Sequence, residues 1–447
     1  MGALASCALE SPQEDAPDAT GACSGGRFRC FAQVREGTRV AGEHQYANPT
    51  GFGPADLQDA YAIPAATGTP TIALIDAYGY TQLEHDLGVY RAQYGLPACT
   101  VANGCLTIVN DQGQPTPLPG AAPAGDDWTI ETALDVDMAS AACPACKLVV
   151  VQATDDQGDG LFTAQNVAAG MGATVISNSW GGPEQPGMPL GTYEAYMAHA
   201  GIAVFVAAGD DGYDDAGMGP DYPATSTHVI AVGGTKLVKS ATARGWAETA
   251  WSSGGSACSL SIPKPAYQTA SPCTYKATTD VAAVGDPATG LAVYDSHSGG
   301  WQVVGGTSAA APIVAAIFAA TGNGAQTSGS FLAANAAKLN DVTAGSNGSC
   351  GTLLCNAATG WDGPTGYGTL NGEAIVAQQT GGDGSGSGSG DDGGGTEGAQ
   401  GATAPGGEVT GGCNVGGNAG GGTGGAASSV VGLALGFAAI TRRRRLA

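Results

Sequence analysis

The stretch KLVVVQATDDQGDGLFTAQNVAAGMGATVISNSW, residues 147–180, decides the fold class. It begins with an apolar run at 147–153, continues through a helical pattern at 161–171, and ends in a second apolar run at 174–180. Parallel strands are joined by helices and are buried on both faces, so they read as continuous apolar runs. The stretch therefore predicts a βαβ unit and an α/β architecture.

The same alternation continues on both sides of this unit. Apolar runs also lie at 71–76 and 202–209, and helical patterns lie at 83–94, 129–141 and 192–200. This order predicts a doubly wound, mostly parallel sheet with helices on both faces. Ligands of such sheets bind beyond the carboxyl ends of the strands, so we expect the functional residues in those loops.

Composition divides the 447 residues into four parts. Residues 1–45 are polar and irregular, and residues 46–378 carry the α/β pattern. Residues 379–425 consist mostly of Gly, Ser, Asp, Thr and Ala, which predicts a flexible linker because they cannot bury a core. Residues 426–447 join a short apolar segment to four arginines, which favours a sorting or anchoring tail over a weakly apolar tail.

Charge excludes one class of partner. The chain has 16 basic and 39 acidic residues, and its net charge is −23. Affinity for nucleic acid depends on lysine and arginine that neutralise phosphates. The sequence therefore excludes a basic nucleic-acid-binding domain.

Ten of the twelve cysteines are close neighbours in the sequence. This spacing predicts five short-loop disulfides and an oxidising compartment, although the CPAC motif at 143–146 could instead bind a metal or act in redox chemistry. The predicted pairs are Cys23–Cys30, Cys99–Cys105, Cys143–Cys146, Cys258–Cys273 and Cys350–Cys355. Cys7 and Cys413, near the two ends, are left as candidates for processing or lipidation.

The sequence GGTSAAAP at 305–312 places a serine at the start of a helix. Its glycines allow a tight turn, and its small residues allow close packing around the helix. Ser308 would lie where the helix dipole stabilises developing negative charge, which suits a nucleophile. A serine that only caps a core helix is the alternative.

A serine nucleophile needs a base, which is usually a histidine. The five histidines are scattered, and none opens a helix in a His-Gly-Thr-His-like segment. This disfavours the Ser-His-Asp triad, and a protease with an unrecognised histidine is kept as an alternative.

The segment DDWTIETALDVD at 126–137 offers a different base. Glu131 and Asp135 are four residues apart on a predicted helix, so their carboxyl groups project from one face. Exposed acidic residues that complement the helix dipole are the alternative. If the two groups are buried together, they share a proton and one pKa rises, which suits a general base in acid.

A third acidic residue follows an apolar run. Asp210 lies in AAGDDG at 207–212, at the predicted carboxyl end of a strand. It could be a turn residue or a calcium ligand. When protonated, it could instead donate a hydrogen bond to an oxyanion.

Together these segments resemble the sedolisin family, the serine-carboxyl peptidases, which have a subtilisin-like fold. The resemblance spans roughly residues 46–378 and includes DLQDAYAIP, ETALDVDMASAACPACKLVVVQA, SNSWGGPE, YPATSTHVIAVGGTKL and PKPAYQ in the family's order. It implies that Ser308 is the nucleophile, Glu131 the base, Asp135 the residue that orients Glu131, and Asp210 the donor to the oxyanion. Hydrolysis would proceed through an acyl-enzyme at acidic pH.

The resemblance also implies one structural Ca²⁺ ion. Residues 340–345 and 359–368 resemble the family's C-terminal calcium loop. Carboxylates and backbone carbonyls supply the oxygen ligands that Ca²⁺ prefers. The expected ligands are the carboxylates of Asp341 and Asp362 and the carbonyls of Val342, Ala358 and Gly360. Two turns rich in glycine and aspartate are the alternative.

Both ends of the chain resemble bacterial export signals. Leu4 to Cys7 resemble the end of a lipoprotein signal, and Cys413 with the apolar segment and the arginines resembles a myxobacterial-type surface-sorting signal. Family members usually carry a long prodomain, whereas residues 1–45 suggest a leader or truncated signal. We expect an exported protein, outside the cell or at its surface, with a processed or membrane-anchored C-terminus.

The sequence thus predicts an exported, monomeric serine-carboxyl endopeptidase that acts on protein or peptide substrates. A tripeptidyl-peptidase-type exopeptidase is one alternative. A noncatalytic cell-surface binding module on the same fold is another.

Overall fold

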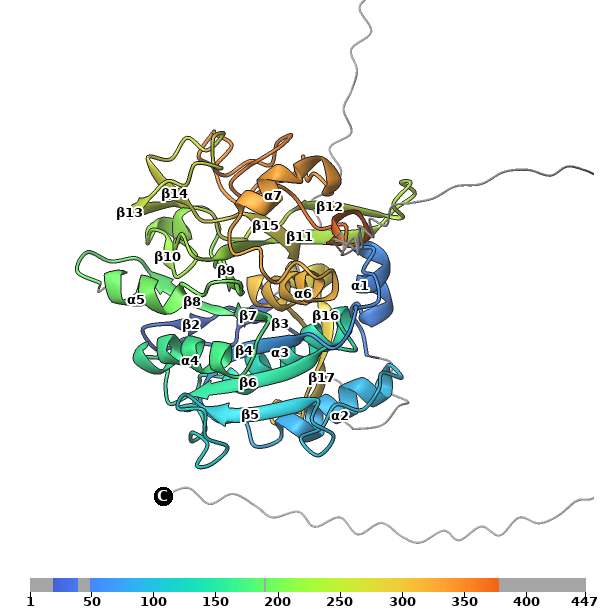
Figure 1. The fold of residues 1–447 in the computed structure, drawn as a ribbon. Helices are drawn as coiled ribbons and strands as arrows, with labels where there is room; N and C mark the ends of the chain where they lie inside the picture. The colour runs from blue at the N-terminus through green and yellow to red at the C-terminus, as the bar shows by residue number, and fades with distance from the viewer. Residues whose placement is uncertain (1–18, 39–48, 189, 378–447) are drawn as a thin grey trace, which may run out of the picture. The chain divides into compact units, whose positions relative to one another are not determined.

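The computed structural model describes residues 19–38, 49–188 and 190–377. An eight-stranded sheet forms the centre of this part of the chain (Figure 1). Neighbouring strands follow the order β12-β11-β9-β7-β4-β6-β5, and β15 also pairs with β11. The strands are β12 (Trp246–Ala250), β11 (Ile230–Lys239), β9 (Ala203–Ala207), β7 (Val175–Asn178), β4 (Thr71–Ala77), β6 (Lys147–Ala153), β5 (Leu106–Asn110) and β15 (Val281–Val284).

All pairs in this sheet are parallel except β11 with β12. Helices cover both of its faces. One layer holds α3 (Trp128–Ala142) and α6 (Thr307–Ala320), which pack together, and the other holds α4 (Asp159–Gly170) and α5 (Leu190–Met197). The predicted doubly wound α/β fold is confirmed, and the predicted strands and helices lie within a few residues of their observed bounds.

Smaller elements surround the central sheet. Helices α1 (Pro54–Ala60) and α2 (Leu83–Gln93) pack on α3, and α7 (Ser330–Ala334) follows α6. Three further sheets have the orders β1-β3-β17-β16, β10-β8-β2 and β13-β14. Their strands are β1 (Ala19–Gly21), β2 (Arg29–Cys30), β3 (Gln33–Arg35), β8 (Trp180–Pro183), β10 (Asp221–Tyr222), β13 (Cys258–Pro263), β14 (Tyr275–Ala277), β16 (Leu291–Asp295) and β17 (Gly300–Gly305).

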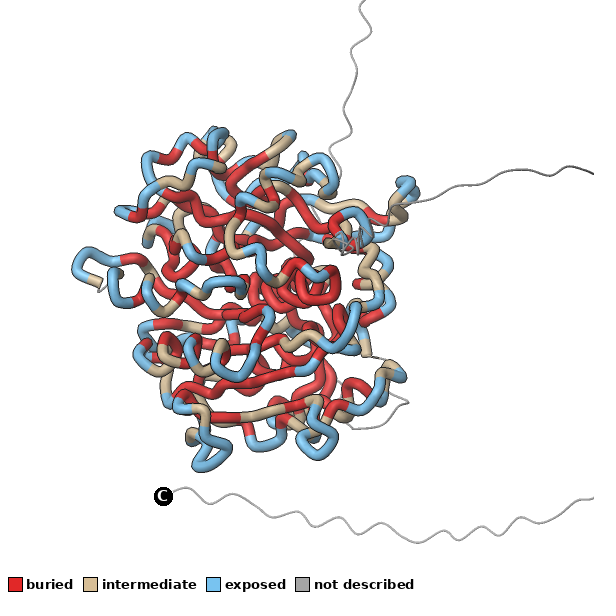
Figure 2. Tube along the Cα trace, in the orientation of Figure 1, coloured by how far each residue is buried: buried red, intermediate tan, exposed pale blue. Residues whose placement is uncertain are grey.

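Helices α3 and α6 are buried along their whole lengths, which places them in the interior (Figure 2). Helix α6 suits this position because it is apolar almost all round. Helix α3 does not, since it carries three buried carboxyl groups, those of Glu131, Asp135 and Asp137. Burying a charge lowers the stability of the fold unless the charge is paired or neutralised. The three carboxyl groups of α3 are therefore candidates for a functional role.

Pro312 lies inside α6, beyond its first turn. Proline has no N–H to donate to the carbonyl four residues before it, which here belongs to Ser308. That carbonyl lies 3.2 Å from Oγ of Ser179 instead. The carbonyl that Pro312 leaves without its helical partner therefore contacts the residue between β7 and β8.

All five predicted cysteine pairs are disulfide-bonded in the structure. Cys143 and Cys146 join the end of α3 to the start of β6, so neither thiol is free to bind a metal, and both residues are buried. Cys7 and Cys413 lie outside the described residues, as do the predicted linker and tail.

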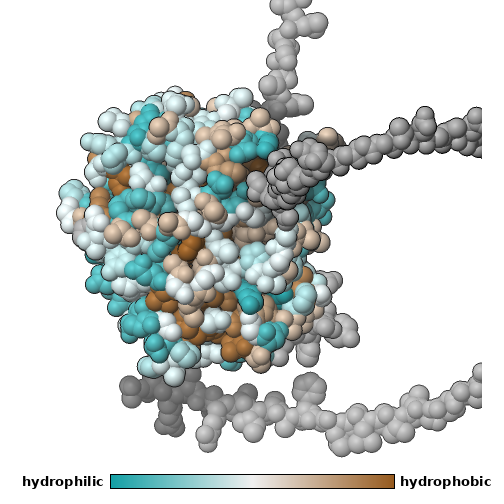
Figure 3. Space-filling view, in the orientation of Figure 1, coloured by the Kyte–Doolittle hydropathy of each residue, from teal (hydrophilic) through white to brown (hydrophobic). Residues whose placement is uncertain are grey.

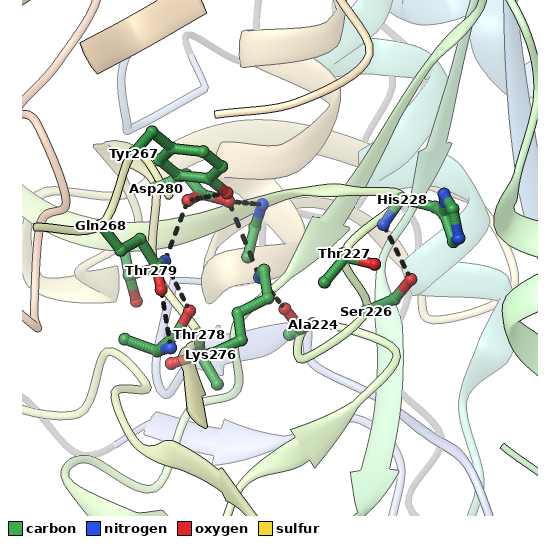
Figure 4. A network of polar contacts seen from close by, with 12 residues as sticks. Ala224, Ser226, Thr227, His228, Tyr267, Gln268, Lys276, Thr278, Thr279 and Asp280 are labelled. Carbon is green, nitrogen blue, oxygen red and sulfur yellow. Dashed lines mark hydrogen bonds and ion pairs between the residues drawn. The ribbon is translucent and has the colours of Figure 1, made fainter. Parts of the chain in front are cut away.

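A buried ion pair links the region before β15 to its surroundings (Figure 4). Nζ of Lys276 lies 3.8 Å from Oδ2 of Asp280 and donates to the carbonyl of Ala224 at 2.8 Å. The carboxylate of Asp280 also accepts hydrogen bonds from the hydroxyl of Tyr267 and from the backbone N–H of Ala231. This network is structural, because all of its charged groups have partners.

On the face seen in Figure 3, hydrophobic residues gather mainly in the lower part and are scattered among hydrophilic residues elsewhere. The large hydrophobic side chains that are exposed, such as Val101, Met218 and Leu260, are far apart in the sequence. Single exposed apolar residues are normal on soluble proteins. Within residues 19–38, 49–188 and 190–377, no helix is both long and apolar enough to cross a bilayer.

Candidate active site

Three segments far apart in the sequence bring the predicted catalytic residues together. Ser308 is the second residue of α6, Glu131 and Asp135 lie on α3, and Asp210 follows β9. Because α3 and α6 pack side by side, the start of α6 lies against the face of α3 that carries the two acids. All four residues are buried, and Asp210 is the most exposed of them, at 6%.

Ser308 and Glu131 are hydrogen-bonded directly. Oγ of Ser308 donates to Oε2 of Glu131 at 2.9 Å. This is the contact that a nucleophile needs with the group that removes its proton. Among the described residues, the other partners of this hydroxyl are backbone groups, and none is a histidine.

Glu131 and Asp135 form the predicted buried acidic pair. Burial raises the pKa of Glu131, and the charge of Asp76 adds to the effect. Burial, followed by the charges of Asp76 and Glu131, raises the pKa of Asp135 in the same way. Oγ of Ser179 donates to Oδ1 of Asp135 at 2.6 Å. No nearby cation lowers the pKa of Glu131 or of Asp135. The two acids therefore keep their protons at pH values at which isolated carboxyl groups on the surface would be ionised.

Asp76 is a third acid in this group, and we did not predict it from the sequence. It is the sixth residue of β4, it is fully buried, and burial raises its pKa to about 7. Neither of its carboxyl oxygens has a hydrogen-bond partner among the described residues. The apolar run that contains Asp76 predicted only a strand. The one sign of a functional role in the sequence was that an acidic residue stands near the carboxyl end of that strand.

Asp210 holds the start of α6 from the other side. Its Oδ1 accepts hydrogen bonds from the backbone N–H and the hydroxyl of Thr307, both at 2.8 Å. Burial nevertheless raises its pKa to about 7, so the group is protonated in acid. Oδ2 has no hydrogen-bond partner within the described part of the chain. The side chain of Gln33 also hydrogen-bonds to this carboxyl group and lowers its pKa, and a protonated Oδ2 can donate a hydrogen bond next to the nucleophile.

Gly306 leaves space between the carbonyl of Phe31 and the carboxyl group of Asp210. Its φ of +98° lies in the region that favours glycine. A Cβ at this position would lie 1.9 Å from the carbonyl oxygen of Phe31 and 2.8 Å from Oδ2 of Asp210. A side chain here would therefore fill the space that the carbonyl and the carboxyl share.

The N-terminal segment of residues 19–35 runs through the site, which the sequence did not predict. Strand β2 pairs with β8, and β3 pairs with β17. The N–H of Phe31 lies 3.1 Å from Oγ of Ser308, and the N–H of Ala32 donates to Oε2 of Glu131 at 2.8 Å. The polar, irregular sequence of this segment gave no signal of such a position.

Comparison with known proteins identifies the family to which this chain belongs. The family model described as the subtilase family matches residues 120–368, which is more than half of the chain. This chain belongs to the subtilase family. Among solved structures, a Pseudomonas sedolisin described as a serine-carboxyl proteinase superposes with a TM-score of 0.62. It is 24% identical and covers 74% of this chain and 98% of that protein, which shows a shared fold.

Three curated proteins are similar to this subtilase in sequence. Kumamolisin from Bacillus sp. (strain MN-32) is 32% identical over 360 residues, and sedolisin from Pseudomonas sp. (strain 101) is 30% identical over 375. These matches cover 73% and 75% of this chain but only 63% and 61% of the relatives. The tripeptidyl-peptidase sed1 of Aspergillus fumigatus is 30% identical over 263 residues, covering 45% of this chain and 40% of that protein. These relatives support the predicted sedolisin family.

In the described region of this subtilase, no histidine forms a hydrogen bond with the hydroxyl of Ser308. His85 pairs with Asp86, and His228 lies 3.9 Å from Glu194. His199 and His297 follow α5 and β16. His44 lies outside the described residues. The partner that the structure gives Ser308 is thus a carboxylate.

The two predicted calcium loops lie side by side in this subtilase. The N–H of Gly360 donates to Oδ2 of Asp341 at 3.0 Å. Burial raises the pKa of Asp362 to about 6, and the charge of Asp341 contributes to the rise. In the described ranges, no group of three or more His, Cys, Asp or Glu side chains could hold a metal. The two carboxylates with nearby backbone carbonyls still fit the oxygen-rich donor set of Ca²⁺.

Proposed function

We propose that this chain is a serine-carboxyl endopeptidase that hydrolyses peptide bonds in acid. The observation that carries the proposal is the 2.9 Å hydrogen bond from the hydroxyl of Ser308 to the buried carboxylate of Glu131. The similarity to kumamolisin and sedolisin supports it. The wider activity and the substrates belong to the proposal because this chain spans about 60% of those relatives.

In this mechanism, Glu131 carries the negative charge of the buried acids. Its Oε2 accepts hydrogen bonds from Ser308 and from a backbone N–H, and both bonds favour the ionised form. Asp135 and Asp76 stay protonated beside it and orient it. Glu131 takes the proton of Ser308 as the hydroxyl attacks the carbonyl carbon, and later gives it to the leaving nitrogen.

Asp210 stabilises the negative charge that develops during the reaction. The tetrahedral intermediate carries a negative oxygen, and a protonated Oδ2 of Asp210 donates to it. The pKa of about 7 keeps this group protonated in acid and ionises it above neutrality. Activity therefore falls as the pH rises through about 7.

Substitution of the two central residues tests the function. Ser308→Ala and Glu131→Gln, assayed on a denatured protein between about pH 3 and pH 6, should both lose hydrolysis. Loss with Ser308→Ala alone would point to a histidine base. An inactive wild-type protein would favour the noncatalytic binding module.

The similarity to a tripeptidyl-peptidase supports an exopeptidase as the second candidate. Peptides with free and with acetylated N-termini distinguish the two activities. An endopeptidase cleaves both peptides within the chain, whereas a tripeptidyl-peptidase releases three residues from the free form only.

We also propose one structural Ca²⁺ ion, held by the carboxylates of Asp341 and Asp362 and by the carbonyls of Val342, Ala358 and Gly360. When bound, it would supply a cross-link between two loops and neutralise two adjacent carboxylates. A ligand at about 100 times its Kd stabilises the folded state by about 2.7 kcal/mol. EDTA should therefore lower the Tm, and Asp341→Asn should remove the response to added Ca²⁺. An unchanged Tm would overturn this site.

Export is the remaining part of the proposal. Five disulfides suit an oxidising compartment, and this supports a location outside the cytoplasm. Fractionation of the cells that make this protein, with mass spectrometry of the chain's two ends, tests export and the proposed processing near Cys413. A full-length chain in the cytoplasm would contradict both.

A further inference from the structure

We propose that Asp295 is a positioning residue for Glu131, and that it holds the first turn of α3 in place while it carries a proton. This inference rests on the proposed peptidase function and adds a second requirement for acid to it. Its basis is a series of hydrogen bonds, the acid–hydroxyl network, in which carboxyl and hydroxyl groups alternate. The members of this network, in order, are Asp86, Tyr80, Asp295, Thr129, Asp127 and Ser298.

The acid–hydroxyl network connects segments that are far apart in the sequence. It begins on α2 at Asp86 and passes through the loop between β4 and α2 at Tyr80. It then crosses the end of β16 at Asp295 and reaches the first turn of α3 at Thr129. All four residues are buried. A charge on any of these side chains therefore has to be paired or neutralised.

Two hydroxyl groups of the network each lie between two carboxyl groups. The hydroxyl of Tyr80 contacts Oδ2 of Asp86 and lies 2.8 Å from Oδ1 of Asp295. The hydroxyl of Thr129 lies 2.7 Å from Oδ1 of Asp127 and 3.0 Å from Oδ2 of Asp295. Each hydroxyl has one proton, so it donates to only one of its two carboxyl neighbours.

The number of protons follows from these contacts. For both contacts of a shared hydroxyl to be hydrogen bonds, one neighbouring carboxyl group has to donate the second proton. Two shared hydroxyls therefore need two protons from the three carboxyl groups. Asp295 carries at most one proton. With all of its hydrogen bonds formed, the network thus has two neutral carboxyl groups and one carboxylate.

The neighbours of Asp86 make it the carboxylate. Nδ1 of His85 lies 2.8 Å from Oδ1 of Asp86, and a half-exposed imidazole carries a proton in acid. The N–H and the hydroxyl of Ser296 both donate to Oδ2 of Asp86 at 2.8 Å. Donors and a positive charge favour the ionised form of a carboxyl group. The two protons therefore belong to Asp295 and Asp127.

The other charged groups near Asp295 do not supply a counter-ion. Burial raises the pKa of Asp137 on α3, and the charges of Asp86 and Asp295 add to the rise. The guanidinium of Arg91 donates to two backbone carbonyls and a serine hydroxyl, and His297 donates to Asp295 through its backbone N–H. Across the described ranges, no cationic side chain forms an ion pair with Asp295. Burial without a counter-ion favours a neutral carboxyl group.

The network holds the helical turn that carries the base. Asp127 caps α3, and its Oδ1 accepts the N–H of Ile130 at 3.3 Å. Thr129 precedes Glu131 by two residues in the same turn. Glu131 accepts the hydroxyl of Ser308 at 2.9 Å, and a displacement of about 1 Å is enough to slow a reaction by about a hundredfold. The position of this turn therefore limits the transfer of the proton from the nucleophile.

The network exchanges protons with solvent. Tyr80, Asp127 and Thr129 line an open cavity at the surface together with His297. As the pH rises, Asp295 and Asp127 lose their protons, and the hydroxyl of Thr129 then lies between two negative charges. One of its two contacts is lost, and the first turn of α3 is no longer held on that side. The network thus requires acid, as the oxyanion donor does.

Substitution of Asp295 in the full chain tests this role. Asp295→Ala removes the contacts to Tyr80 and Thr129 and should lower kcat at about pH 4 by up to about a hundredfold, with little change in KM. Asp295→Asn keeps one acceptor and one donor, as a protonated aspartate does, so its kcat should stay close to the wild-type value. Equal losses of kcat in both variants would overturn the proposal, because an ionised Asp295 has no donor to replace.

Thr129 provides a matched pair of variants. Thr129→Val removes the hydroxyl but keeps the shape of the side chain, and it should lower kcat as Asp295→Ala does. Thr129→Ser keeps the hydroxyl and should retain kcat. Because both residues act through one contact, the Asp295→Ala and Thr129→Val double variant should be no slower than either single variant. Additive losses would show that the two residues act separately and would contradict the network.

Infrared spectroscopy tests the proton without any activity. In Ser308→Ala at about pH 5, where an ordinary aspartate is ionised, the spectrum separates neutral carboxyl groups from carboxylates. Adding Asp295→Asn should remove one neutral carboxyl band. Removal of a carboxylate band instead would overturn the proposal, and this result does not depend on whether Asp295→Ala folds.

The positioning role and the peptidase function fail in different ways. If the wild-type chain hydrolyses a denatured protein in acid but Asp295→Ala and Thr129→Val keep its kcat, the positioning role is wrong and the peptidase function stands. If the wild-type chain hydrolyses nothing, the proposed function fails, and the role of Asp295 in catalysis fails with it.

Discussion

Two buried acidic groups in this molecule have different surroundings. Asp280 is fully buried, and its carboxylate accepts hydrogen bonds from Tyr267, Gln268 and the N–H of Ala231, with Lys276 at 3.8 Å (Figure 4). Glu131, Asp135 and Asp76 are equally buried, and each has at least one carboxyl oxygen without a hydrogen-bond partner in the described part of the chain.

The difference separates a structural acid from the acids that we propose as catalytic. A buried charge with a counter-ion and hydrogen bonds holds the chain in place, while a group of buried acids without a cation costs stability. Such a cost persists at sites where altered proton affinity is useful. We therefore interpret the first group as a scaffold and the second as the source of proton transfer.

The largest expected effect concerns the catalytic group. Ser308→Ala and Glu131→Gln should each lower kcat/KM at about pH 4 by at least about a thousandfold, because nucleophile and base act as one unit. The double variant should be no worse than either single variant, whereas the folded stability should not fall. Additive losses in the double variant would show that the two residues act independently.

Substitutions in the ion pair of Lys276 and Asp280 should lower stability rather than activity. Lys276→Met leaves the carboxylate of Asp280 without its counter-ion and should lower the free energy of unfolding by about 3–5 kcal/mol. Activity per folded molecule should stay near the wild-type value. Adding Asp280→Asn should restore part of the stability. If urea unfolding shows that the free energy of unfolding falls by less than about 1 kcal/mol, the contrast between the structural and the catalytic acids is wrong.

The third prediction concerns pH and stability. Burial raises the pKa of Asp210 to about 7, while the unfolded chain has an ordinary aspartate pKa of about 3.9. The folded state therefore binds more protons between these values, and stability falls as the pH rises from about 4 to about 7. Ser308→Ala, which lacks the proposed nucleophile, is the background for this measurement.

Asp210→Asn in that background should remove up to about 4 kcal/mol of the pH-dependent change in unfolding free energy, since one pKa unit corresponds to about 1.36 kcal/mol. Urea unfolding at several pH values measures it. Parallel pH profiles for the two proteins would mean that Asp210 is not a buried acid with a raised pKa.

The smallest effect is expected at Asp76. Asp76→Asn removes one carboxyl from beside Glu131 and should lower kcat by up to about a hundredfold through loss of orientation. The pH profile should change near pH 7, where Asp76 ionises in the wild-type protein and its negative charge raises the pKa of Glu131. An unchanged pH profile would limit Asp76 to packing.

The sequence predicted the fold because local patterns encode it. The stretch 147–180 corresponds to β6, α4 and β7, and the spacing of Glu131 and Asp135 placed both acids on one helix face. Asp210 could be predicted because it directly follows a strand. These inferences needed only periodicities of about two and about 3.6 residues and the geometry of strand ends.

The rest depended on contacts between distant residues. Asp76 ends an apolar run and looks like a strand residue until α3 is packed against β4. The segment 19–35 has no periodicity, and its position follows from pairing with β8 and β17, which are distant in the sequence. Strand pairing of this kind leaves little trace in the sequence of a short, polar segment.

The pH dependence of kcat/KM between about pH 3 and pH 8 tests the central claim, that buried carboxyl groups replace a histidine beside Ser308. We expect activity in acid that falls as Asp210 ionises through about pH 7, and loss at every pH in Glu131→Gln. A serine activated by histidine would instead gain activity between about pH 5 and pH 7 as the imidazole loses its proton. Such a rise, retained in Glu131→Gln, would contradict the claim.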